Sequence, residues 1–205
     1  MRIAIMVEGD TELAFKRHLT DYLKQHLQGR MPRLDFVPYH GRIPKGATLK
    51  RNVENLLLVG RSQADLVIAL TDVYTGTRPP DFTDAADAKN KMRQWVGNEP
   101  RFRPHAAQHD FEAWLLPYWP TIQRLAGHNR NAPGGDPENV NHTNPPSRRI
   151  QEIFEVGQRR DSYNKPRDAN HILSKNDLSV AILRCPELRA LVNTIFQACG
   201  GAVIP

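Results

Sequence analysis

Three carboxylates surround a glycine directly after the first apolar run of the chain. The segment VEGDTE places Glu8, Asp10 and Glu12 around Gly9, behind the apolar stretch at residues 2–7. A carboxylate that follows a buried strand at once is unusual, and a glycine lets a ligand approach the backbone closely. Because Glu12 lies one helical turn after Glu8, both side chains can face one cleft. Clustered carboxylates favour a divalent cation, which neutralises their mutual repulsion.

Further acidic residues follow two other apolar runs. Asp72 comes after residues 65–70, and His109, Asp110 and Glu112 come after residues 102–108. Parallel strands joined by right-handed crossovers end at one edge of a sheet, and ligands of such folds bind at that edge. We therefore expect four carboxylates to converge there and to hold Mg²⁺ or Mn²⁺, which are hard cations that prefer oxygen ligands. The predicted metal ligands are Glu8, Glu12, Asp72 and Glu112.

Each of these residues also has an ordinary structural explanation. Asp10 and Glu12 are typical of the first turn of a capped helix, where acidic side chains favour the helix dipole. Asp72 could begin a turn, and His109 could be a hydrogen-bonded histidine of the core. Glu8 is the hardest of the set to explain without a ligand.

Basic residues are concentrated in two segments of a chain whose net charge is +6. Residues 16–51 contain nine lysines and arginines against two acidic residues, and residues 148–175 contain seven against four. Basic surface attracts phosphate polyanions, although solubilising charge on helix faces would give the same count. An acidic centre in a basic protein is the charge pattern expected of metal-assisted phosphodiester chemistry.

The elements that must position these residues alternate between strand and helix, which indicates an α/β fold with a parallel sheet. A short amphipathic helix is expected at 109–119. We interpret residues 1–120 as one α/β core. The predicted strands are 2–7, 34–39, 65–70 and 102–108, and the predicted helices between them are 11–28, 48–59 and 84–96, with Asp10 or Thr11 capping the first.

The pattern changes after residue 120. Residues 126–146 are rich in Asn, Pro and Gly, which predicts a long loop. A helix beginning near residue 147, a loop at 159–168 and two helices near 169–175 and 186–198 follow. We interpret residues 121–205 as a loop and helical extension packed on the core.

Composition excludes several classes of protein. Hydrophobic residues make up 40% of the 205 positions and charged residues 24%, as in soluble globular domains. The chain contains neither an apolar run long enough for a membrane helix nor a secretory signal, and its two cysteines form no disulfide framework, so we expect a cytoplasmic protein without membrane contact. It also lacks a P-loop, a GxGxxG motif after a strand, HExxH and CxxC.

The motif VEGDTE resembles the opening motif of Toprim domains, which occur in topoisomerases, bacterial primases and overcoming-lysogenization-defect (OLD) nucleases. The segments TDVYTGTRPPDF, QHDFEAWLL, PPSRRI, YNKP and LRCPELRALV resemble, in order, segments of the DUF4276 family of Toprim-like bacterial proteins. The resemblance covers nearly the whole chain. It implies a Toprim-like parallel four-stranded sheet with flanking helices and a C-terminal helical extension.

The resemblance assigns roles to several residues. Glu8 matches the first invariant acid of Toprim domains, and Asp72 matches the first Asp of their DxD pair. Tyr74 stands where the second Asp would be, so Glu112, or less readily Asp81, would have to replace that ligand. The residues expected to bind the phosphates of nucleic acid are Arg42, Lys45, Arg148, Arg149 and Lys165.

Three functions remain open at this point. The first is a metal-dependent nuclease acting on DNA or RNA as an effector of bacterial anti-phage defence, with catalytic residues Glu8, Asp72, His109 and Glu112. The second is a non-catalytic nucleic-acid-binding or regulatory subunit of an AAA/ABC-type ATPase, because the resemblance implies such an ATPase encoded nearby. The third is a small phosphoester hydrolase or nucleotide-binding protein. The sequence also leaves open a homo-oligomer.

Overall fold

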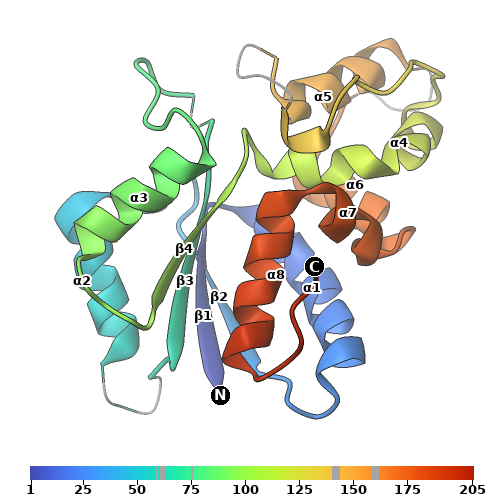
Figure 1. The fold of residues 1–205 in the computed structure, drawn as a ribbon. Coiled ribbons are helices and arrows are strands. Elements are labelled where there is room, and N and C mark those ends of the chain that lie inside the picture. Colours follow the sequence, from blue (N-terminus) through green and yellow to red (C-terminus); the bar gives the residue numbers. More distant parts are fainter. Residues whose placement is uncertain (59, 61–62, 75, 140–143, 158–161) are drawn as a thin grey trace.

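A four-stranded parallel sheet with strand order β2-β1-β3-β4 forms the centre of the protein (Figure 1). The computed structural model describes residues 1–58, 60, 63–74, 76–139, 144–157 and 162–205. The predicted α/β fold is confirmed, and the four predicted strands lie within a few residues of their expected bounds. The strands are β1 (Arg2–Val7), β2 (Arg33–Pro38), β3 (Leu66–Asp72) and β4 (Phe102–Ala107).

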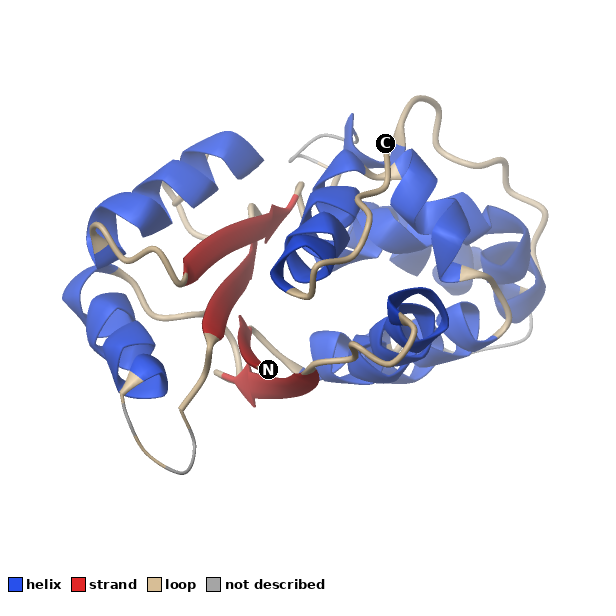
Figure 2. Cartoon of the chain, turned by 60° about the horizontal axis from the view of Figure 1, so that its bottom comes forward, coloured by secondary structure: helices blue, strands red, loops and turns tan. Residues whose placement is uncertain are grey.

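Helices cover both faces of the sheet (Figure 2). In β1, Ile3 and Ile5 point into a large apolar core that also contains residues of α1 and α8. Ala4 and Met6 point into a smaller core on the opposite face, with residues of α2 and α3. Strands buried on both faces explain the continuous apolar runs of the sequence. The bounds of these helices are α1 (Asp10–Leu27), α2 (Gly46–Leu57), α3 (Ala85–Val96) and α8 (Pro186–Ala198).

The second half of the chain adds short helices that pack on the α1 side of the sheet. Apolar residues of these helices belong to the same buried cluster as the residues of β1, so one core joins both halves of the chain. No helix in the described ranges is both long and apolar enough to cross a membrane. The helices are η1 (Phe111–Tyr118), α4 (Trp119–Ala126), η2 (Pro137–Asn139), α5 (Pro146–Val156), α6 (Lys165–Ser174) and α7 (Leu178–Arg184).

The prediction of an amphipathic helix at 109–119 is wrong in the kind of helix, although a helix is present there. The chain forms the 3₁₀ helix η1, and all of its residues except Pro117 are buried. Helices α4, α5, α6 and α7 all pack against it, so no face remains for solvent. The 3₁₀ helix leads directly into α4, where Trp119 begins the next helix.

The other differences concern where elements begin and end. Gly9, and neither Asp10 nor Thr11, occupies the N-cap position of α1. Helix α6 begins at Lys165, inside the predicted loop, because the Asn164 side chain accepts a hydrogen bond from Arg167 N at 3.1 Å. Helix α7 was not predicted. The expected helix end at 59 and parts of the loops at 126–146 and 159–168 lie outside the described residues.

Both outer strands of the sheet contain a proline. Pro38 ends β2 and Pro104 lies within β4. Proline has no backbone N–H, so it is tolerated at the edge of a sheet and not in its centre.

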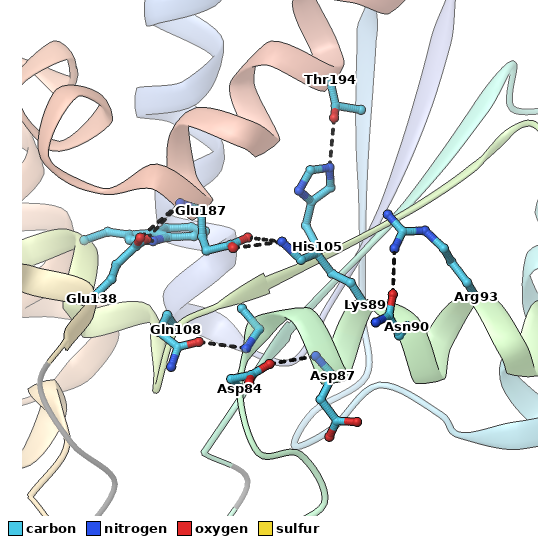
Figure 3. Close-up of polar contacts among 12 residues, drawn as sticks. Asp84, Asp87, Lys89, Asn90, Arg93, His105, Gln108, Glu138, Glu187 and Thr194 are labelled. Carbon is cyan, nitrogen blue, oxygen red and sulfur yellow. Dashed lines mark hydrogen bonds and ion pairs between the residues drawn. The ribbon is translucent and has the colours of Figure 1, made fainter. Parts of the chain in front are cut away.

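Glu138 ties helix η2 to η1 and to the beginning of α8 (Figure 3). Its carboxylate accepts hydrogen bonds from Trp114 Nε1 at 3.0 Å and from Glu187 N at 3.0 and 3.2 Å. The side chain of Glu187 in turn accepts two hydrogen bonds from Lys89 on α3, at 2.6 and 2.8 Å. These contacts connect both helix layers at the β4 side of the sheet.

Replacement of Glu138 should destabilise the fold. Glu138→Ala leaves the buried indole N–H of Trp114 and the partly buried backbone N–H of Glu187 without their acceptor, so we expect the free energy of unfolding to fall by about 2–4 kcal/mol. Urea denaturation followed by circular dichroism measures this change. The control is Glu54→Ala, an exposed glutamate 4.0 Å from Lys50, which should change stability by less than about 0.5 kcal/mol. Equal effects of the two variants would contradict the assigned role of Glu138.

Candidate functional site

The acidic residues gather where the order of the strands reverses. From β1 the chain connects to β2 on one side and then crosses to β3 on the other, so the switch point lies between β1 and β3. Glu8 follows β1 directly, and Asp72 is the last residue of β3, paired in register with Ala107. Open parallel sheets bind ligands at such points, outside the carboxyl ends of their strands.

Glu8 is almost fully buried, with 9% of its surface exposed. Thr71 Oγ1 on β3 donates a hydrogen bond to Glu8 Oε1, which links the two strands that flank the switch point. Burial raises the pKa of Glu8 to about 7, although the Thr71 hydrogen bond and the charge of Arg42 lower it. A carboxyl group with this pKa can accept or release a proton near neutral pH.

Glu12 performs the capping role that its spacing allows and also faces the acidic residues. Its Oε2 accepts a hydrogen bond from Gly9 N at 3.1 Å, which satisfies a backbone donor at the start of α1. Burial, with a contribution from the charges of Glu8 and Glu112, raises the pKa of Glu12 to about 7. The helix-cap explanation and the proximity to the other carboxylates therefore both hold.

Asp72 and Asp110 belong to the same group of buried acidic residues. Desolvation raises the pKa of Asp72 well above its ordinary value, and the charges of Glu8 and Glu12 contribute to this rise. Asp110 is 2% exposed, and burial followed by the charge of Glu112 raises its pKa to about 7. Its Oδ2 accepts a hydrogen bond from Ser147 N at 3.1 Å, while its Oδ1 has no hydrogen-bond partner among the described residues.

Asp110 lies at this edge of the sheet, as expected of a residue that follows β4, although no metal-binding or catalytic role was predicted for it. It stands between two predicted site residues, His109 and Glu112. His109 has a left-handed backbone (φ 66°), an uncommon conformation for a residue with a side chain. Its carbonyl oxygen accepts a hydrogen bond from Tyr74 N at 2.6 Å, which ties the end of β4 to the end of β3. The ring of His109 is buried.

Glu112 is 1% exposed and lies on η1 beside a lysine from the second half of the chain. Lys165 Nζ is 3.2 Å from both carboxylate oxygens, and the Tyr163 hydroxyl donates to Oε1 at 3.4 Å. Burial would lower the pKa of Lys165, but the carboxylates of Glu112, Asp110 and Asp72 outweigh it and raise that pKa. The charge of Lys165 therefore partly offsets the acidic group.

Three of the other predicted phosphate-binding residues, Arg42, Lys45 and Arg148, form ion pairs. Lys45 Nζ lies 2.5 Å from Asp81 Oδ2, and Arg42 Nη1 lies 3.9 Å from the same oxygen. Asp81, the weaker candidate for a metal ligand, thus faces two cations. Arg148 pairs with Glu152 and Glu155 of its own helix at 3.7 and 3.6 Å. Arg149 lies next to it on α5 and is partly buried.

The carboxylates fit a hard cation that is only partly held by protein. Among the described residues, no three His, Cys, Asp or Glu side chains lie close enough together to ligate one ion. Mg²⁺ commonly keeps several water molecules and takes one or two carboxylates together with substrate phosphates. The raised pKa values of Glu8, Glu12 and Asp110 show that negative charge is unfavourable there, and a cation would relieve this.

Comparison with protein families identifies the chain. A family model described as a domain of unknown function, DUF4276, matches residues 7–195. The chain belongs to the DUF4276 family. A comparison with curated proteins gives no significant match for this DUF4276 protein.

One solved structure confirms the Toprim-like fold expected of the DUF4276 protein. The C-terminal region of the OLD protein of Burkholderia pseudomallei aligns with a TM-score of 0.57 and 14% sequence identity, covering 97% of this chain and 98% of that one. The C-terminal region of the OLD protein of Xanthomonas campestris pv. campestris aligns with a TM-score of 0.49 and 14% identity, covering 97% and 96%. At this level of identity the likeness concerns the fold alone.

The raised pKa values predict how the stability of the DUF4276 protein depends on pH. Between about pH 5 and pH 8 the folded carboxyl groups keep protons that the unfolded chain has lost, so their contribution to the free energy of unfolding falls as pH rises. Glu12→Gln keeps an acceptor for Gly9 N and removes one charge. We expect this variant to gain at least about 1 kcal/mol over the wild type across that range, measured by urea denaturation.

The comparison with the wild type removes the contribution of His105, and added Mg²⁺ gives a second test of the same carboxylates. Burial lowers the pKa of His105 to about 3, which gives an opposite pH dependence, but His105 is present in both proteins and cancels in the comparison. Millimolar Mg²⁺ should stabilise the wild type more at about pH 8 than at about pH 6, because a cation binds ionised carboxylates. A stability difference between Glu12→Gln and the wild type that does not change with pH would contradict the prediction.

Proposed function

We propose that this DUF4276 protein is a metal-dependent nuclease that hydrolyses phosphodiester bonds of DNA or RNA. The observation that carries the proposal is the buried group of carboxylates at the switch point of the sheet, with a lysine beside it. One or two of Glu8, Glu12, Asp72 and Glu112 at a time, together with water molecules and a substrate phosphate, would hold Mg²⁺ or Mn²⁺. The bound cation would stabilise negative charge on the attacking or leaving oxygen of the phosphodiester.

The side chains of the chain itself supply the remaining functions. Glu8, whose pKa is about 7 without a bound cation, would accept the proton of the attacking water near neutral pH when the other carboxylates hold the cation. Lys165 would contact a non-bridging phosphate oxygen and stabilise developing charge. The buried ring of His109 and its left-handed backbone favour a role in positioning Asp110 and Glu112 over direct proton transfer.

The wider setting of the reaction is also a proposal. The Toprim-like fold and the excess of basic residues support a nucleic acid as the substrate. In the OLD proteins this fold is a C-terminal region and is therefore joined to another part of the protein. The family resemblance implies an AAA/ABC-type ATPase encoded nearby, and we propose that this ATPase is the partner of the chain. A role as a cytoplasmic effector of anti-phage defence follows from the same family resemblance. We further propose that residues 1–120 form the Toprim-like core and 121–205 the extension, with each part contributing to the site.

A second function is favoured by two specific observations. Lys165 already neutralises Glu112, and Tyr74 occupies the position of the second Asp of the DxD pair. Both features reduce the negative charge available to a metal. They support a non-catalytic subunit that binds nucleic acid and regulates an ATPase.

Nuclease assays with matched carboxylate variants test the proposed function. Purified wild type, Glu8→Gln and Asp10→Asn are incubated with plasmid, single-stranded DNA and tRNA, in Mg²⁺, Mn²⁺ or EDTA. We expect cleavage by the wild type only with a metal, and a loss of at least about 100-fold in Glu8→Gln, which removes the proton acceptor. Asp10 is an exposed carboxylate two residues away, so Asp10→Asn should cleave like the wild type.

The possible results separate the two functions. Cleavage that persists in Glu8→Gln would overturn the assignment of Glu8. Salt-dependent binding of nucleic acid without cleavage, even with the ATPase present, would favour the regulatory subunit.

A further inference from the structure

A recess of about 430 Å³ lies directly beside the buried carboxylates. This volume is within the range of small-ligand sites, about 300–1,000 Å³. The recess brings together the end of β3, the first turns of α5 and the start of α6. Its lining includes Tyr74, Ser147, Arg148, Gln151, Tyr163 and Lys165.

Three of the lining residues also contact the carboxylates. Lys165 and Tyr163 hydrogen-bond to Glu112, and the backbone N–H of Ser147 hydrogen-bonds to Asp110. The recess and the acidic group therefore share one wall. A molecule with a phosphate at the carboxylates would place its adjoining group in the recess.

The recess combines an exposed aromatic ring with cationic side chains. Tyr74 is 43% exposed and is the only aromatic residue among the large exposed hydrophobic side chains of the described residues. Its backbone is fixed by the hydrogen bond to His109. The side chains of Arg148 and Lys165 are each 50% exposed at the same recess. Exposed aromatic rings next to basic side chains are what proteins use to stack bases and hold the backbone of single strands.

We propose that this recess receives an unpaired nucleobase, stacked on Tyr74, from a single-stranded nucleic acid whose adjacent phosphate lies at the carboxylates. The inference rests on the proposed function and specifies its substrate class. A base inside a duplex is covered by its neighbours and cannot enter a recess of this kind without leaving the stack. Stacking does not discriminate strongly among bases, so recognition is independent of sequence.

Binding measured in Mg²⁺ over times too short for cleavage, and again in EDTA, tests the recess apart from catalysis. The probes are a fluorescein-labelled thymidine 12-mer, an abasic 12-mer with the same phosphates and a 12-base-pair duplex, with Kd measured by fluorescence anisotropy at one fixed salt concentration. We expect the wild type to bind the thymidine strand about tenfold more tightly than the abasic strand, because only the former can stack. The duplex presents no unpaired base inside its stack, so its affinity should not change when Tyr74 is replaced.

Variants of Tyr74 then locate the effect. Tyr74→Ala should remove the preference for the thymidine strand and leave binding of the abasic strand unchanged. Tyr74→Phe keeps the ring and should retain the preference, whereas Tyr74→Leu keeps apolar bulk without a ring and should lose it. Leu183→Ala is the control, because Leu183 is 61% exposed and lines a different recess. Thermal unfolding verifies that every variant is folded.

The outcomes distinguish this inference from the nuclease proposal. Equal affinity of the wild type for the thymidine and abasic strands would overturn the inference, even if metal-dependent cleavage is found. A preference for the thymidine strand that survives in Tyr74→Ala would also overturn it. A preference that depends on Tyr74 in a protein that cuts nothing would support the recess and overturn the nuclease proposal alone.

Discussion

The burial of several like charges at one edge of the sheet is the constraint on which the rest of the structure depends. Carboxylates removed from water and placed near one another are unfavourable unless neighbouring groups compensate them. The protein supplies hydrogen-bond donors from several elements: the Thr71 hydroxyl on β3, Gly9 N before α1, and Ser147 N on α5. Lys165 adds one positive charge. The raised pKa values show that this compensation is incomplete.

Two of the compensating groups lie in the second half of the chain, and the shared apolar core holds them beside the acids of the first half. Ser147 and Lys165 belong to helices that the sequence places far from β1, yet both contact acids at the carboxyl end of the sheet. Their position depends on the packing of α5 and α6 against η1 and on the packing of α6 against α1. A helical extension that only covered apolar surface would not need to place a lysine there.

Sequence reasoning predicted the features that follow from local periodicity. The four strands and the acids behind three of them were expected because apolar runs and adjoining carboxylates are visible along the chain. The hydrogen bond from Ser147 to Asp110 and the 3₁₀ form of η1 were not, since both depend on helices that pack from residues more than thirty positions away. The start of α6 at Lys165 depends on a side-chain cap by Asn164 and was missed within a polar segment. Contacts between distant parts of the chain therefore determine these features, and the local sequence pattern could not predict them.

The prolines of the two outer strands limit how copies of this protein could assemble. An open sheet edge offers unpaired N–H and C=O groups to a strand of another molecule, which is a common route to dimers and to aggregation. Pro38 and Pro104 each interrupt that row of donors. At the β4 side of the sheet, an ion pair joins Lys89 on α3 to Glu187 on α8, so side chains from both helix layers meet there. A strand added at either edge of the sheet would therefore lack a hydrogen-bond donor at the position of the proline.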